Sequence, residues 1–435
     1  MIQTIDLRGT PVTEEAAAQW LPRPEVDVAH AMEAARALVE EVRTEGEAAL
    51  ARQAERFDGV APPQLRVPED ALDAAVQTLP AELADAIGLA IQRVRAATAA
   101  QVPPAAETVL ADGARVLQRW QPVSRVGLYV PGGKAVYPSS VIMNVVPAQV
   151  AGVGSIALAS PPQRAFSGSV HPTILAVARL LGVDEVYAMG GAGAIGALAY
   201  GVPSAGLRRV DVVTGPGNVY VAAAKRVVHG VVGIDAEAGP TEIVVIADSS
   251  ADARLVAADL ISQAEHDDQA ASVLITTDAS LAERVVAELA EQAGRTRHRE
   301  RVSTALAGPQ SAIVLVDDEA AAAAVSNAYG PEHLELQTAD PYATLSLITN
   351  AGAIFLGGHA PVSLGDYLAG SNHVLPTGGQ ARFSAGLSAA TFLRPQQIVD
   401  YDLAALDSVT DALVAFAQAE GLPAHGDAAL ARRLS

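Results

Sequence analysis

Short apolar segments alternate with Ala-rich segments over most of this 435-residue chain, and this alternation most restricts its fold. From Arg125 onward, runs such as VGLYV, SIALAS and DVVTG are separated by helix-forming stretches. A second series with the same rhythm contains EIVVIAD, SVLITT, AIVLVDD and AGAIFLG. Strands that are apolar without interruption are typical of parallel sheets covered on both faces. The sequence therefore predicts an α/β fold with two related doubly wound modules.

The segments before and after these two series are predicted to be helical. Up to about Gln101 the chain is rich in Ala, Glu and Arg, with apolar residues three and four positions apart. This spacing is typical of amphipathic helices. After about Gly386 the strand pattern stops, and a helical tail is expected. Such a tail either folds back or reaches another subunit, and the sequence leaves both open.

Composition excludes several kinds of site. A formal net charge of -20 argues against a nucleic-acid partner, because phosphate contacts need clustered positive charge. The chain has no cysteine, which excludes disulfides, iron–sulfur clusters and thiolate zinc sites. No secretory signal is visible, and Pro, Asn and Gly interrupt the uncharged stretch from Ala135 to Gln163. We therefore expect a cytoplasmic protein without a membrane partner.

Two glycine-containing loops each follow a predicted strand and precede a predicted helix. Gly191, Gly193 and Gly196 form a GxGxxG pattern after EVYAMG, and the second loop is GPGN, which ends at Asn218. Such loops can place a pyrophosphate at a helix N-terminus. They can equally be tight turns that need residues without a Cβ atom. Spacing alone does not decide between these readings.

Polar side chains that can bind a metal are scattered over four short segments in the second half of the chain. They are Gln263 and His266 in ISQAEHDD, Glu332 and His333 in YGPEHLEL, Asp366 and His373 in PVSLGDYLAGSNHVLPTGG, and His425 in GLPAHGD. If these converge, imidazole nitrogens and carboxylate or amide oxygens suit zinc or a harder divalent metal. Gln263 and His266 are three residues apart near the end of a predicted helix, so both can reach one ion.

The adjacent Glu332 and His333 also suit acid–base chemistry. A carboxylate can orient a water, and an imidazole exchanges protons near neutral pH. Each segment nevertheless has a structural alternative. His266 can be a solvated residue at a helix C-terminus, Glu332 and His333 can form an exposed ion pair, and Asp366 can complete a turn. The tail histidine by itself would be assigned to the surface.

Taken together, the motifs resemble the histidinol dehydrogenase family of zinc- and NAD-dependent enzymes. The similarity covers nearly the whole chain and is carried by IDLRG, VGLYVPGG, SPP, GGAGAIGALAYG, TGPGN, IDAEAGPTE, ADLISQAEHD, AYGPEHLE, PVSLGDYLAGSNHVLPT and GLPAH. The resemblance implies oxidation of L-histidinol to L-histidine through histidinal, in two successive NAD-dependent hydride transfers. It also implies a domain-exchanged homodimer with shared active sites.

The domain organisation implied by the resemblance is two incomplete Rossmann-like domains with small N- and C-terminal helical segments. Residues 1–28 are expected to form the N-terminal segment. Residues 29–128 and 240–385 are expected to form the first Rossmann-like domain, which carries the metal and catalytic residues. Residues 129–239 are expected to form the NAD-binding domain, and residues 386–435 a helical tail that reaches the partner subunit.

The resemblance also assigns the site residues. One Zn²⁺ per subunit is expected to be held by ligands from both chains: Gln263, His266 and Asp366 from one subunit and His425 from the other. Glu332 is expected to activate water, and His333 to be the acid–base residue. Further contacts to histidinol are expected from Thr241, His373 and Glu420, beside His333 and the zinc ligands. Contacts to NAD are expected from Tyr129 and Asn218.

One position departs from the family pattern. Gly193 stands where the family has Gln in GGAQA, so the GxGxxG match is not a dinucleotide fingerprint, and a cofactor contact is expected to be missing. Two other functions fit some of the residues: a zinc hydrolase in which Glu332 activates water, and a non-catalytic relative that binds a small cation. The TGPGN loop favours a nucleotide-using enzyme, and the full set of proposed ligands argues against a non-catalytic relative.

Overall fold

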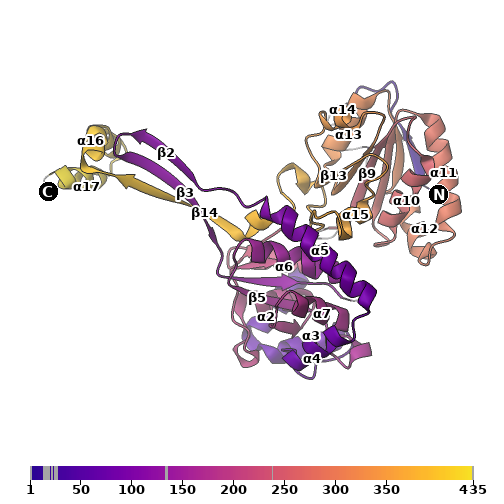
Figure 1. The fold of residues 1–435 in the computed structure, drawn as a ribbon, viewed down its shortest axis with the longest axis horizontal. Coiled ribbons are helices and arrows are strands. Elements are labelled where there is room, and N and C mark those ends of the chain that lie inside the picture. Colours follow the sequence, from indigo (N-terminus) through magenta and orange to yellow (C-terminus); the bar gives the residue numbers. More distant parts are fainter. Residues whose placement is uncertain are drawn as a thin grey trace.

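The computed structural model describes residues 2–12, 20, 23, 28–132, 136–237 and 239–433. These residues form two α/β modules, each built on a parallel sheet, and an arm that projects away from them (Figure 1). The predicted α/β fold with parallel sheets is confirmed.

The first module is a six-stranded parallel sheet with the order β1-β11-β10-β9-β12-β13. Its strands are β1 (Gln3–Asp6), β9 (Glu242–Ala247), β10 (Ala271–Thr276), β11 (Ala312–Leu315), β12 (His333–Gln337) and β13 (Ala353–Leu356). One face packs on α10 (Ala253–Ala264), α11 (Ala279–Ala293), α12 (Arg299–Ala307) and α15 (Val362–Tyr367). The other face packs on α13 (Glu319–Tyr329) and α14 (Pro341–Leu345).

The second module is a five-stranded parallel sheet with the order β6-β5-β4-β7-β8. Its strands are β4 (Arg125–Tyr129), β5 (Ser155–Ser160), β6 (Val186–Ala188), β7 (Val212–Thr214) and β8 (Gly233–Ile234). Helices α4 (Glu69–Gln77), α5 (Ala81–Ala99), α6 (Pro138–Val150) and α7 (Pro172–Leu180) cover one face. Helices α2 (Val28–Glu45), α3 (Glu47–Phe57), α8 (Gly191–Tyr200) and α9 (Val219–Val228) cover the other.

Both modules share one strand arrangement. In the second sheet, β4 is first in chain order and lies between β5 and β7; in the first sheet, β9 lies in the same way between β10 and β12. After the central strand, the chain therefore adds strands first on one side of it and then on the other side. In open parallel sheets, ligands bind beyond the carboxyl ends of the strands at this switch point.

The arm is a three-stranded antiparallel sheet with two helices at its far end (Figure 1). It contains β2 (Ala106–Ala111), β3 (Ala114–Pro122), β14 (Leu393–Tyr401), α16 (Leu403–Ala419) and α17 (Pro423–Arg433). Residues 386–435 were predicted to be a helical tail, and this needs one correction: α16 and α17 are helical, but β14 is a strand that pairs with β3 over its whole length. The sequence LRPQQIVDY lacks the apolar pattern used to find strands, since most of its residues are exposed in this ribbon.

The packing also differs from the predicted grouping of residues 29–128 with residues 240–385. Helices α2 to α5 cover the five-stranded sheet, and Ala35, Val39 and Val42 of α2 lie buried in that core. An amphipathic pattern identifies the face of a helix that becomes buried, but not the sheet that buries it. From the predicted N-terminal segment, β1 joins the six-stranded sheet by pairing with β11.

No single helix among the described residues is long and apolar enough to cross a membrane. Helices α4 and α5 reach that length and hydropathy only as a pair, and the pair is bent by 111°. Residues of both helices are buried in the core of the five-stranded module.

Candidate active site

Four of the predicted site residues lie at the amino-terminal edge of the six-stranded sheet. Thr241 directly precedes β9, and Glu332 directly precedes His333, the first residue of β12. These two strands are parallel neighbours, with His333 paired to Ile243. Helix α10 ends at the same edge, where Gln263 contacts Thr241. The pairing of β9 with β12 therefore brings together segments that are far apart in the sequence.

Glu332 is a buried carboxyl group held by two donors. Its Oε2 atom accepts hydrogen bonds from the Thr241 hydroxyl at 2.5 Å and from the backbone N–H of Glu242 at 3.0 Å. Burial raises the pKa of Glu332 to about 8, although both hydrogen bonds favour the ionised form. The carboxyl group is thus poised to change its protonation state in the range where a general base is effective.

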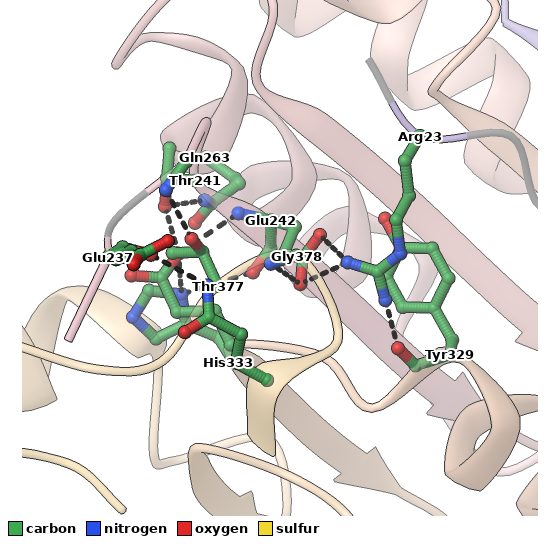
Figure 2. Close-up of polar contacts among 12 residues, drawn as sticks. Arg23, Glu237, Thr241, Glu242, Gln263, Tyr329, His333, Thr377 and Gly378 are labelled. Carbon is green, nitrogen blue, oxygen red and sulfur yellow. Dashed lines mark hydrogen bonds and ion pairs between the residues drawn. The ribbon is translucent and has the colours of Figure 1, made fainter. Parts of the chain in front are cut away.

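Gln263 has an amide oxygen without a partner. Its Nε2 atom donates a hydrogen bond to the Thr241 hydroxyl at 2.5 Å (Figure 2). Its Oε1 atom is buried, and no described residue donates a hydrogen bond to it. A buried carbonyl oxygen without a donor is costly unless something else satisfies it. An amide oxygen is also a suitable ligand for a cation, so Gln263 fits a metal-binding role.

His333 is held in one tautomer. Its Nδ1 atom lies 3.2 Å from the backbone carbonyl of Glu242, which can only accept, so Nδ1 carries the proton and Nε2 has the free lone pair. Burial lowers the pKa of His333, which keeps the ring neutral near pH 7. Its ring lies against Phe355, with the ring centroids 6.2 Å apart. His333 therefore has the state that a general base requires.

His266, Asp366 and His373 lie around this pair. The Nδ1 atom of His266 lies 3.2 Å from the carbonyl of Ser262, which leaves Nε2 as the available nitrogen. The Nδ1 atom of His373 lies 3.0 Å from the backbone carbonyl of Asp366. Burial lowers the pKa of His373, and the charges of Asp366, His333 and His266 also act on it. The carboxylate of Asp366 therefore acts on the imidazoles of both His333 and His373.

The site faces the second module. The Nε2 atom of His373 lies 3.0 Å from the hydroxyl of Ser140, in α6. The neighbouring Asn372 donates a hydrogen bond to the carbonyl of Met143 in the same helix at 2.7 Å. The loop that carries His373 thus links the catalytic candidates to the five-stranded module.

Two predicted site residues lie far from this cluster within one chain. His425 is in α17, and Glu420 directly follows α16 as its C-cap residue; both helices lie at the tip of the arm (Figure 1). Both side chains are exposed. Over the described ranges, no group of three or more His, Asp or Glu residues is arranged to hold a metal. The predicted four-ligand zinc site is therefore not assembled within a single chain.

The two predicted NAD contacts lie at the carboxyl edge of the five-stranded sheet, on either side of its switch point. Tyr129 ends β4, and its hydroxyl accepts a hydrogen bond from the backbone N–H of Gly191 at 3.2 Å. Burial raises its pKa to about 12. Asn218 follows β7 and caps α9 by accepting from the N–H groups of Tyr220 and Val221. The positions of Tyr129 and Asn218 suit a ligand, while the contacts that their side chains make are structural.

Gly193 lies in α8 and faces α3. A Cβ atom at this position would lie 2.2 Å from Oε1 of Gln53. The Nε2 atom of Gln53 donates to the carbonyl of Leu38 at 3.0 Å and to Glu41 at 3.1 Å, which holds this side chain in place. The glutamine of α3 thus fills the space next to the glycine. Sequence reasoning missed Gln53, because it lies 140 positions earlier in an ordinary helix.

Sequence reasoning also missed Glu242, which supports both catalytic candidates. Its N–H donates to Glu332, and its carbonyl accepts from His333. Its buried side chain forms a 2.6 Å ion pair with Arg23, whose guanidinium lies over the ring of Tyr329 (Figure 2). The available signal was a charged residue at the start of the apolar strand EIVVIAD.

Comparisons with known proteins agree on one family. A family model described as histidinol dehydrogenase matches residues 21–433. A histidinol dehydrogenase from Leifsonia xyli subsp. xyli is 66% identical over 431 residues, covering 99% of both chains. One from Thermobifida fusca is 57% identical over 432 residues, covering 99% of this chain and 98% of the relative. The crystal structure of histidinol dehydrogenase from Elizabethkingia anophelis superposes with a TM-score of 0.92 at 33% identity, covering 99% and 98% of the two chains.

Proposed function

This chain belongs to the histidinol dehydrogenase family, and from that premise we propose how its residues oxidise histidinol. The activity is that of an oxidoreductase in histidine biosynthesis, with histidinol and NAD as its ligands. The product L-histidine requires two oxidations, first of the alcohol to histidinal and then of the hydrated aldehyde. The observation that carries the mechanism is the pair of buried bases, Glu332 and His333, with different proton affinities at one sheet edge.

His333 is the proposed base for both oxidations. Its Nε2 lone pair takes the hydroxyl proton of the alcohol, and later that of the hydrate. The bond from Nδ1–H to the carbonyl of Glu242 holds the tautomer that this role needs and stabilises the imidazolium that forms. NAD, when bound, accepts the hydride in each oxidation. Burial of the imidazole keeps it neutral before each proton transfer.

Glu332 is the proposed base for the hydration step. As a carboxylate it removes a proton from water while the water oxygen bonds to the aldehyde carbon. The carbonyl oxygen gains the proton that His333 took from the alcohol, which returns His333 to the neutral form for the second oxidation. The Thr241 hydroxyl and the Glu242 N–H both point at Oε2, so they orient the group and favour its ionised form. Glu332 and His333 therefore act in sequence from one edge of the sheet.

We propose that Zn²⁺ binds Gln263, His266 and Asp366 of one subunit and His425 of the partner subunit. The unpartnered Oε1 of Gln263 and the available Nε2 of His266 support this set. Oxygen and imidazole ligands suit zinc in a chain without cysteine. Zinc, when bound, fixes the amine and imidazole of histidinol and so orients the reacting carbon. His373, Thr241 and, from the partner arm, Glu420 are proposed to complete the substrate contacts.

We further propose a domain-exchanged homodimer in which each arm reaches the partner's site. The arm carries Glu420 and His425 away from their own site, and its exposed apolar side chains include Val109, Val399 and Phe416, at 69%, 70% and 72%. Apolar side chains gathered on one projecting element are typical of an interface. Both modules are proposed to be incomplete Rossmann-like domains, which the central positions of β4 and β9 support.

NAD is proposed to bind at the switch point of the five-stranded sheet, with contacts from Tyr129 and Asn218. The strand order and the carboxyl-end position of both residues support this. The side chain of Asn218 uses its oxygen to cap α9, so its amide nitrogen is the group left for the cofactor. Gly193 has no side chain that could contact the cofactor.

The function is tested by following NADH absorbance with histidinol and NAD, before and after removal of metal by a chelator. We expect two NADH for each histidinol, loss of activity on chelation, and recovery with Zn²⁺. The variant Glu283→Gln, at an exposed position of α11, is a matched control that should behave as wild type. Absence of NADH formation from histidinol would contradict the proposed function.

A further inference from the structure

Glu335 is a fully buried carboxyl group that the mechanism above does not use. It lies two residues after His333 in β12, so both side chains project from the same face of the strand. Its paired neighbours on β9 and β13 are Val245 and Phe355, which belong to the apolar core beneath α10. A carboxyl group in such a setting needs a specific partner.

The partner is Asp259 of α10, one helical turn before Gln263. Gln337 donates a hydrogen bond to both carboxyl groups, at 2.9 Å to Glu335 and at 3.4 Å to Asp259. The two groups are also near enough for each to shift the pKa of the other. The Oε1 atom of Glu335 has no N–H or O–H donor among the described side chains. Two buried carboxyl groups that lie on one amide donor are not both ionised, because like charges repel strongly in an apolar surrounding, so a shared proton stabilises the pair.

Burial and the charge of Asp259 place that proton on Glu335. Burial raises the pKa of Glu335 to about 9, and Asp259 adds to the shift. Burial raises the pKa of Asp259 only to about 6. Among the described residues, the backbone of Val362 from α15, the apolar neighbours on β9 and β13, and the amide of Gln337 near Glu335 are uncharged. His333, on the same face of β12, is neutral near pH 7 because burial lowers its pKa. Near neutral pH the pair therefore carries one proton and one negative charge.

We propose that Glu335 is a positioning residue whose carboxyl proton bonds to Asp259, fixes α10 on β12, and so sets the position of Gln263 relative to His333. On α10, Asp259 and Gln263 are four residues apart and share a face. On β12, His333 and Glu335 share a face. Helix α10 and strand β12 therefore contact each other through Asp259 and Glu335, next to the proposed functional residues Gln263 and His333. This inference rests on the proposed roles of Gln263 and His333.

The variant that isolates the proton is Glu335→Gln. Its amide oxygen can accept from Gln337 and its amide nitrogen can donate to Asp259, so the contacts remain while the titration is removed. We expect activity near neutral pH to be retained within about 3-fold. Wild type should lose activity as pH rises through about 9, where Glu335 ionises and two buried charges face each other, whereas the variant should not lose activity there.

A stability measurement separates this inference from the proposed function. The folded wild type must hold a proton on Glu335 that the unfolded chain releases above its ordinary pKa of 4.5, so wild-type stability falls relative to the variant as pH rises from about 4.5 to about 9. The Tm of Glu335→Gln minus that of wild type should therefore grow between pH 5 and 9. This holds whether or not histidinol is oxidised. A constant Tm difference would overturn the shared proton.

The variant Glu335→Leu tests positioning, because it leaves Asp259 and Gln337 without their partner. We expect its KM for histidinol to rise about 10-fold or more while Glu335→Gln stays near wild type. If Glu335→Leu fails to fold, Asp259→Asn provides the second test: it removes the facing charge that raises the pKa of Glu335, so the alkaline loss of activity should move to lower pH. Wild-type KM in Glu335→Leu, or an alkaline loss at the same pH in wild type and Glu335→Gln, would overturn the proposal.

Discussion

The hydroxyl of Thr241 lies 2.5 Å from Oε2 of Glu332 and donates a hydrogen bond to it. The same hydroxyl accepts a 2.5 Å hydrogen bond from Nε2 of Gln263. One short side chain therefore orients the carboxylate proposed to activate water and turns the oxygen of Gln263 toward the proposed metal. Because Thr241 holds two functional groups at once, its substitution should affect both of them.

Replacement of Thr241 by Val should reduce kcat/KM for histidinol by about 10- to 100-fold, because both functional groups lose their shared partner. Zinc affinity should weaken as well, since Gln263 is then free to rotate. Thr241→Ser keeps the hydroxyl and serves as the matched control. Equal activities of the Val and Ser variants in steady-state assays would show that this hydroxyl orients neither group.

Replacement of Glu332 by Gln should change the pH dependence of stability. In the metal-free protein the pKa of Glu332 is about 8, so the folded state keeps a proton that the unfolded state loses above its ordinary value of 4.5. The stability of wild type relative to Glu332→Gln should therefore fall between about pH 4.5 and 8, by up to about 1.4 kcal/mol per pH unit. Urea unfolding at several pH values measures this.

The same variant separates the two oxidations. Glu332→Gln should oxidise histidinal at least about 100-fold more slowly than wild type, because the base for hydration is lost. The oxidation of histidinol to the aldehyde depends on His333 and should be affected less. If both oxidations slow by the same factor, Glu332 does not have the role proposed for it.

Replacement of Gly193 by Ala should destabilise the protein by about 1 kcal/mol, because the new Cβ displaces Gln53 from its position. In a Gln53→Ala background the clash with that side chain is gone, and the same change should stabilise by about 0.5–1 kcal/mol through helix propensity. A double-mutant cycle by chemical denaturation measures the coupling. Identical effects in the two backgrounds would mean that Gly193 and Gln53 do not interact.

The strands of both modules could be predicted because their segments are apolar on both faces, as in EIVVIAD. The arm could not, because β14 is mostly exposed and its stability comes from pairing with β3, a partner more than 270 residues away. Local patterns likewise found the helical nature of α2, but not the sheet that it covers.

The site residues were found through motifs and not through their geometry. The contact between Thr241 and Glu332 depends on β9 lying next to β12, which no local pattern specifies. Glu242 and Glu335 were missed because their roles come from burial and from partners on other elements. For Glu242 the available signal was a charged residue at the start of an apolar strand, whereas the alternating polar residues of HLELQ gave no such signal for Glu335.

Heterodimers show whether the arm of the partner subunit completes each active site. His425→Ala and His333→Ala homodimers should each be nearly inactive. A purified heterodimer of the two contains one site with both histidines and one site with neither, if the arms are exchanged. We expect it to recover about half of wild-type NADH formation from histidinol. If the verified heterodimer is as inactive as its parents, His425 acts in its own chain and the shared site is contradicted.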